Sequence, residues 1–139
     1  MGISSFGTLL KRGDGATPTE VFATIAEVLD ISGPGEELRT EESTNHSSVD
    51  GAVERTATLL DSGEITYDVN LDPSGVTHTN LRTDMRNRTL RNFQQIFPDT
   101  ANTQVDFAAY VTKFQPSAPV EGVLKASITL SISGPTTWT

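Results

Sequence analysis

The sequence predicts a mainly β fold, an antiparallel β-sandwich or barrel with one flanking α-helix and a long loop. Three features lead to this prediction: several segments alternate polar and apolar residues, one segment has helical spacing, and turns rich in glycine and proline separate them. The clearest alternation runs from Leu124 to Ile132, where every second residue is apolar and those between are polar. Such a strand belongs to a sheet with one face in a core and one polar face.

Two strands and a long polar segment are expected in the first half of the chain. Residues 21–30 are rich in β-branched residues without a helical stripe, which favours a strand. Residues 64–71 alternate regularly and are flanked by turn sequences, so a second strand is expected there. Residues 33–58 are polar, and a loop of that length is usually functional or disordered. A short helix or a mobile hairpin within it is the alternative.

One short amphipathic helix is expected over residues 79–87. Leu81 and Met85 lie four positions apart, and Thr77 or Thr79 is placed to cap the helix. Alternating segments complete an expected set of about five strands: residues 89–97, 105–114 and 123–133.

Length and composition limit the class of protein. The 139 residues are enough for one domain with a real core, so we expect a single domain over 1–139. The chain has no cysteine, which excludes disulfides, thiolate metal sites and cysteine nucleophiles. We expect no membrane association, because no stretch approaches the roughly 20 apolar residues needed to cross a bilayer.

The net charge of −8 is unevenly distributed. Residues 20–72 hold thirteen acidic residues and two arginines, whereas residues 78–92 hold four arginines and one aspartate. Both could be solvated faces, or the acidic part of one copy could meet the basic segment of another in a head-to-tail assembly. Tight nucleic-acid binding is not expected, since it requires a dominant basic patch.

No catalytic or cofactor motif is present. The two histidines, His46 and His78, are 32 positions apart, and a metal site needs several converging ligands. The paired glutamates within residues 36–42 lie in a polar loop where nothing would desolvate them, which favours solvated side chains over a catalytic pair. No phosphate-binding loop and no G-x-S-x-G motif occurs. We therefore expect no enzyme activity, no metal and no cofactor.

Four segments, in this order and spacing, resemble the tail tube (major tail) protein of long-tailed bacteriophages and related prophages: GDGATPTEVFATIAEVLDISGPG, LLDSGEITYDVNLDP, FPD and FAAYVTKFQPSAPVEGVLKASITLSISG. The resemblance covers residues 7–134. It implies two packed β-sheets with one flanking helix. It also implies a structural protein whose six copies form a ring, with rings stacking into a tube through which DNA passes.

The resemblance also implies where the subunits meet and what accompanies them. Contacts between rings would come from an N-terminal arm (1–18), a long acidic inter-subunit loop (33–58) and a C-terminal tail (134–139). The partners would be further copies of the chain, the tape measure, tail terminator and tail tip proteins, and DNA that passes without tight binding. The subunit would assemble in the host bacterial cytoplasm and end in the virion tail.

Two sets of residues are candidates for assembly. The complementary charges of the acidic loop and the arginine-bearing helix suit ring stacking or ring closure. A polar strand face would make a hydrated channel wall, although the sequence leaves open which face that is. The inter-subunit candidates are Glu36, Glu37, Arg39, Glu41, Glu42, Arg55, Arg82 and Arg86, and the lumen-face candidates are Glu64, Asp68, Lys125, Ser127 and Thr129.

Two other functions remain as alternatives. A stand-alone β-sandwich could bind carbohydrate through exposed aromatic residues, but the chain has only nine aromatic residues and most are needed for the core. A small hydrolase using paired carboxylates ranks last.

Overall fold

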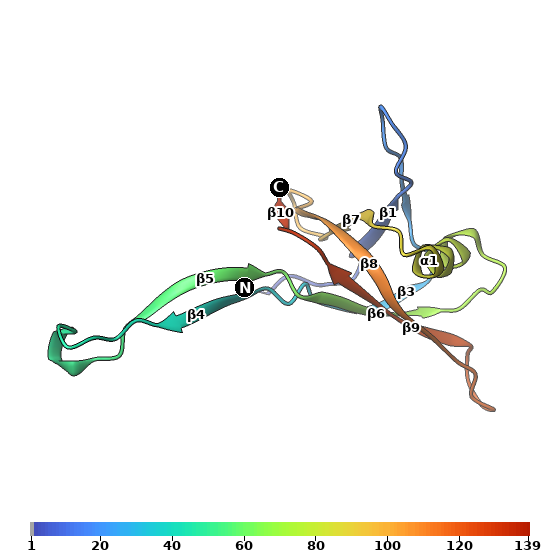
Figure 1. Ribbon diagram of the computed structural model, residues 1–139. Helices are drawn as coiled ribbons and strands as arrows, with labels where there is room; N and C mark the ends of the chain where they lie inside the picture. Colours follow the sequence, from blue (N-terminus) through green and yellow to red (C-terminus); the bar gives the residue numbers. More distant parts are fainter. Residues whose placement is uncertain (1) are drawn as a thin grey trace.

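The computed structural model describes residues 2–139, which form one curved antiparallel sheet, one helix and a projecting two-stranded hairpin (Figure 1). The eight-stranded sheet has the order β2-β1-β7-β8-β9-β6-β3, and β10 also pairs with β8. Its strands are β1 (Leu9–Gly13), β2 (Phe22–Thr24), β3 (Val28–Ser32), β6 (Glu64–Asn70), β7 (Arg91–Ile96), β8 (Gln104–Ser117), β9 (Lys125–Ile132) and β10 (Thr137–Trp138).

The sheet curls around a single core. Its two edge strands, β2 and β3, are joined by only three residues, so the edges must lie close together and the sheet nearly closes into a barrel. Tyr67, Phe93 and Ile128 are fully buried inside, and Phe93 stacks on Phe107 with ring centroids 5.8 Å apart. The helix α1 (Val76–Asn87) contributes Leu81 to this core. The predicted fold class is therefore confirmed.

Four of the predicted strands are present close to their predicted bounds. They are β6, β7, β8 and β9. In β6, β8 and β9 the apolar residues of the alternating pattern are the buried ones, whereas in β7 the buried residues are Phe93 and the polar Gln95. These four strands pair side by side at the centre of the sheet. Regular alternation identified them because each has one face in the core and one face outside it.

The single strand predicted over residues 21–30 is wrong. The first strand, β2, ends at Thr24. The next residue, Ile25, is buried, and its backbone N–H donates to the carbonyl of Leu10. The chain then turns at Glu27, whose φ is 60°, and continues as β3 at the opposite edge of the sheet. β-Branched residues predicted extended backbone but gave no sign of this crossing.

The short strands β1 and β10 were not predicted. β1 lies within residues 1–18 and pairs with both β2 and β7, whereas β10 lies within residues 134–139 and pairs with β8. Each terminal segment therefore contributes one short strand to the main sheet. Trp138 of β10 stacks on Phe97 with ring centroids 5.8 Å apart.

The helix starts three residues earlier than predicted and ends at the predicted residue, Asn87. The predicted cap by Thr77 or Thr79 is wrong, because the N-cap is Gly75 and no side chain caps the helix. The turn that follows β6 already directs the backbone into the helix, and Thr79 N–H bonds to the carbonyl of Gly75.

Candidate assembly surfaces

One polar surface covers the outside of β6 and β9, and we call it the polar face. The lumen-face candidates of β6 and those of β9 belong to this one surface, because the two strands pair with their alternating polar residues opposite one another. The opposed pairs are Glu64 with Ser131, Thr66 with Thr129, Asp68 with Ser127, and Asn70 with Lys125.

The polar face continues onto β8. Lys113 lies opposite Thr129 and Gln115 lies opposite Ser127. A bulge at Thr112 interrupts the register, and its hydroxyl donates to the carbonyl of Thr129 at 3.2 Å. The extra residue shifts the alternation of β8 by one position. After the bulge, Phe114 packs against the core, and Lys113 and Gln115 lie on the polar face.

The charges on the polar face nearly balance. Glu64 and Asp68 of β6 are exposed, as are Lys113 of β8 and Lys125 of β9. Between these charges lie the hydroxyls of β9, which are half-buried. The surface is thus hydroxyl-rich with two acids and two lysines, and it lacks the dense positive charge that holds a nucleic-acid backbone.

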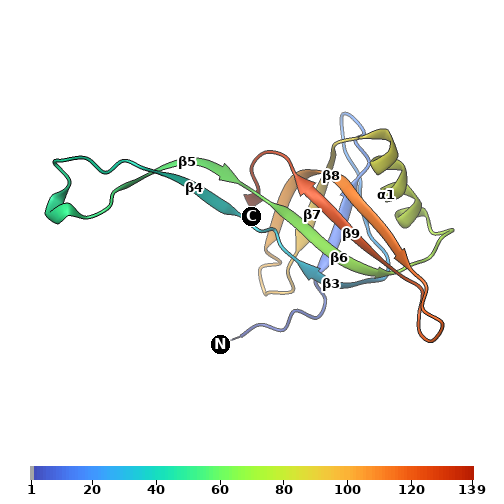
Figure 2. The same ribbon diagram turned by 60° about the horizontal axis from the view of Figure 1, so that its bottom comes forward.

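The polar segment predicted as a long loop forms a hairpin of β4 (Glu37–Glu42) and β5 (Arg55–Asp61), with a 3-10 turn, η1 (Val49–Gly51), near its tip. We call residues 36–61 the acidic hairpin. The two strands pair only with each other and project away from the body in both views (Figures 1 and 2). Every residue of β4 is exposed.

The acidic hairpin carries seven acidic residues and two arginines. Its one internal ion pair joins Arg39 to Asp61 at 3.3 Å, and both side chains are well exposed. A hydrogen bond from the backbone N–H of Gly63 and one from Arg39 lower the pKa of Asp61. The Thr136 hydroxyl donates to Glu36 at the base of the hairpin, which ties the C-terminal segment to it. The other inter-subunit candidates of the hairpin are Glu37, Glu41, Glu42 and Arg55.

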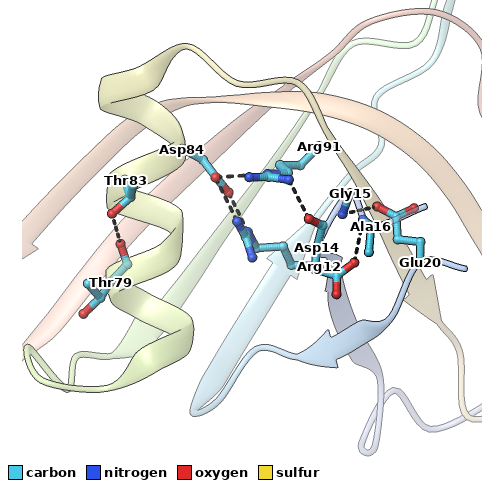
Figure 3. A network of polar contacts seen from close by, with 9 residues as sticks. All are labelled: Arg12, Asp14, Gly15, Ala16, Glu20, Thr79, Thr83, Asp84 and Arg91. Carbon is cyan, nitrogen blue, oxygen red and sulfur yellow. Dashed lines mark hydrogen bonds and ion pairs between the residues drawn. The ribbon is translucent and has the colours of Figure 1, made fainter. Parts of the chain in front are cut away.

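The helix separates its charges by face. Asp84 points inward and is buried between Arg12 of β1 and Arg91 of β7 (Figure 3). Arg91 also donates to the backbone carbonyl of Asp14, which links the helix to the turn between β1 and β2. Arg82 and Arg86 point outward, and neither makes an ion pair within residues 2–139.

The outward side of α1 also borders a pocket that sequence analysis missed. Its volume is about 220 Å³, and its apolar residues include Leu71, Met85 and Phe114. Arg82 and Arg86 line the same pocket. Little in the sequence indicated this pocket, because its apolar residues come from three segments that only the fold brings together.

The histidines have no catalytic arrangement. His78 is buried, where its Nδ1 accepts the backbone N–H of Asp72 at 3.1 Å and its Nε2 lies 2.8 Å from the carbonyl of Ala26. Both ring nitrogens are thus used to hold the start of α1 against the turn between β2 and β3. In the described part of the chain, no group of three or more histidine, aspartate or glutamate side chains is arranged to bind a metal. No helix among these residues is long and apolar enough to span a membrane.

Known structures share this fold along nearly the whole chain. A chain from the virion of a native gene transfer agent is 18% identical, with a TM-score of 0.76 and 99% of both chains covered. A chain from the tail of an empty gene transfer agent particle, refined with C6 symmetry, is 20% identical, with a TM-score of 0.74 and 94% of both chains covered. A chain from the SPP1 tail tube is 14% identical, with a TM-score of 0.65, and the match covers 94% of this chain and 74% of that one.

The sequence comparison identifies the family. No curated protein matches the chain. Residues 12–139, however, match the family of lambda phage tail tube proteins, and this range includes the acidic hairpin, the polar face and the helix. The chain therefore belongs to the lambda phage tail tube protein family, and it is a non-enzymatic structural subunit of a virion tail tube.

Proposed function

We propose that six copies of this chain close into a ring, that the rings stack into a tube, and that DNA passes through the lumen into the host. The observation that carries the proposal is the acidic hairpin, whose two strands pair only with each other and project from the body of the subunit. An isolated two-stranded hairpin is at best marginally stable in water, so a neighbouring subunit must supply its contacts. The C6 symmetry of the gene transfer agent tail, whose chain has this fold, supports a ring of six.

The polar face would line the lumen. The opposite face of its strands packs in the core, so the polar face presents a continuous surface of hydroxyls and charges on one side of the subunit. Glu64, Asp68, Lys125, Ser127 and Thr129 would then meet the passing DNA. Because two acids and two lysines alternate with neutral hydroxyls, phosphates would find no dense positive charge and would slide without tight binding.

The contacts between rings would come from the acidic hairpin together with the outward face of α1. The candidates are Glu36, Glu37, Arg39, Glu41, Glu42, Arg55, Arg82 and Arg86. The complete tail would add tape measure, tail terminator and tail tip proteins, and assembly would take place in the host cytoplasm.

The test is electron microscopy of the purified protein over a concentration series. We expect hollow tubes whose end views average to sixfold rings. Rings of another symmetry would overturn the hexamer, and monomers at every concentration would overturn self-assembly by this chain alone.

A labelling experiment tests the lumen assignment. Because the chain has no cysteine, Asp68→Cys provides a single thiol on the polar face, and Ala101→Cys in the exposed turn between β7 and β8, outside every proposed contact surface, is the matched control. A maleimide attached to a protein too large for the lumen should label both variants as free subunits. In tubes it should label only the Ala101→Cys variant. Equal labelling of both variants in tubes would contradict a luminal polar face.

A further inference from the structure

The pocket beside α1 has an apolar floor and a positively charged rim. Leu71, Met85 and Phe114 form the floor and pack against the core from the other side. Arg82 and Arg86 line the pocket while remaining exposed, and no carboxylate of residues 2–139 pairs with them. The two guanidinium groups, one helical turn apart on α1, therefore lie beside an apolar site with no partner of their own in the described part of the chain.

The tip of the acidic hairpin has the opposite arrangement. Val49 and Val53 are exposed by 74% and 55%, although valine is usually buried. Asp50 and Glu54 follow them directly in the chain, and neither carboxylate makes a hydrogen bond or ion pair within the described residues. The tip thus presents apolar side chains flanked by two negative charges.

The tip and the pocket lie at opposite ends of the subunit. Strand β6 connects to the acidic hairpin before Glu64 and leads to α1 after Asn70, so its length of roughly 20 Å separates the two ends. Both views show the hairpin leaving one end of the body and α1 lying at the other (Figures 1 and 2). A hairpin cannot reach the pocket of its own subunit, but it can reach that of a copy placed head to tail.

We propose that the hairpin tip of one copy docks in the α1 pocket of a copy in the next ring. Val49 and Val53 cover the apolar floor, and Asp50 and Glu54 pair with Arg82 and Arg86. This inference rests on the proposed stacking of rings and names the contact that performs it. The contact joins two different surfaces, so it repeats without closing and extends the tube.

Charge reversal at the pocket tests the docking. Arg82→Glu combined with Arg86→Glu should leave the circular dichroism spectrum and thermal midpoint of the subunit unchanged. The concentration required for tube formation should rise on the order of tenfold or more, since like charges would now face each other. Arg88→Glu reverses one charge at the end of the same helix, outside the pocket, and should assemble normally. Normal tubes from the Arg82→Glu/Arg86→Glu variant would overturn the docking.

A charge exchange makes the test specific. Asp50→Lys with Glu54→Lys should also impair assembly, and combining these changes with Arg82→Glu and Arg86→Glu should restore tubes. Failure of the combined variant, with its subunit still folded, would contradict pairing between these four side chains. Assembly of the parent chain should weaken as salt is raised, because the pairs lie near the surface.

Cross-linking separates this inference from the proposed tube. Copies carrying Val49→Cys are mixed with copies carrying Arg86→Cys and treated with a short bismaleimide, with Asn87→Cys outside the pocket as the control. We expect mixed dimers from the pocket variant and none from the control. Mixed dimers without tubes would uphold the docking and overturn the proposed tube. Tubes without mixed dimers would overturn only the docking.

Discussion

The buried carboxylate of Asp84 allows the attachment of the helix to be measured. Its side chain is 3% exposed, and its Oδ2 accepts the Nε of Arg12 at 2.5 Å. Its Oδ1 accepts a second Arg12 nitrogen at 2.8 Å and the Nε of Arg91 at 3.2 Å (Figure 3). One residue of α1 is therefore held to strands β1 and β7 at once. Asp84→Ala removes all of these contacts and leaves two guanidinium groups without a partner.

The expected loss of unfolding free energy depends on how well water can solvate Arg12 and Arg91 once Asp84 is gone. Removing one member of a buried ion pair costs about 3–5 kcal/mol of unfolding free energy. The side chains of Arg12 and Arg91 are 13% and 26% exposed, so water recovers part of their solvation and the lower figure applies. We expect a loss of about 3 kcal/mol. With an unfolding entropy of about 2.1 cal/mol/K per residue, this lowers the thermal midpoint of 139 residues by about 10 °C.

Thermal and urea unfolding of the monomeric chain, followed by circular dichroism, provide the measurement. Asp68→Ala is the matched control, because its exposed carboxylate has no partner within residues 2–139 and its loss should change stability by less than about 0.5 kcal/mol. If Asp84→Ala unfolds within about 1 kcal/mol of the parent chain, the arginines rehydrate freely. The ion-pair cluster would then not hold the helix in place.

Three further changes have expected outcomes. Tyr67→Phe removes a buried hydroxyl that has no hydrogen-bond partner, so the unfolding free energy measured in urea should stay the same or rise slightly; a fall of more than about 1 kcal/mol would contradict this. Gly63→Ala should cost more than about 1 kcal/mol in the same measurement, because φ is +73° and the new Cβ would collide with the carbonyl of Gly35; an unchanged midpoint would show that the hairpin base adapts. Hydrogen bonds from the hydroxyl and backbone N–H of Thr103 hold the pKa of Asp99 below its ordinary 3.8. The ionised Asp99 therefore stabilises the folded chain above about pH 4, and this contribution is lost as the carboxylate is protonated on acidification. Thr103→Val should therefore reduce the loss of stability between pH 5 and pH 2 (about the range in which carboxylates titrate), and an unchanged acid profile would count against it.

The centre of the sheet was predictable from sequence because each central strand separates the core from the outside. From Lys125 to Ile132 the alternation is complete, and burial follows it residue by residue. The edges were less predictable. Phe22–Thr24 and Val28–Ser32 are too short to show a period, and their separation depends on Glu27 adopting a positive φ. No local pattern indicated that the chain crosses there from one edge of the sheet to the other.

The candidate surfaces were predicted in composition but not in geometry. Two alternating strands gave the polar residues of β6 and β9, and their pairing on one face depended on strand order, which the sequence did not provide. The acidic hairpin was recognised as an unusual polar segment, yet its strands have no buried face and so no alternation to detect. Pocket residues such as Leu71 and Phe114 are 43 positions apart, and only the fold brings them together.

The basic segment shows why charge counts alone do not locate an interface. Arg82 and Arg86 are four residues apart and share the outward face of α1, whereas Asp84 lies between them in sequence and points inward. Arg91 belongs to the internal cluster with Asp84. The helix therefore has two separable roles: Asp84→Ala should lower subunit stability and weaken assembly as a consequence, while reversal of Arg82 and Arg86 should weaken assembly at full subunit stability. A pair of variants that failed to separate in this way would mean that the inner and outer charges of α1 act as one network.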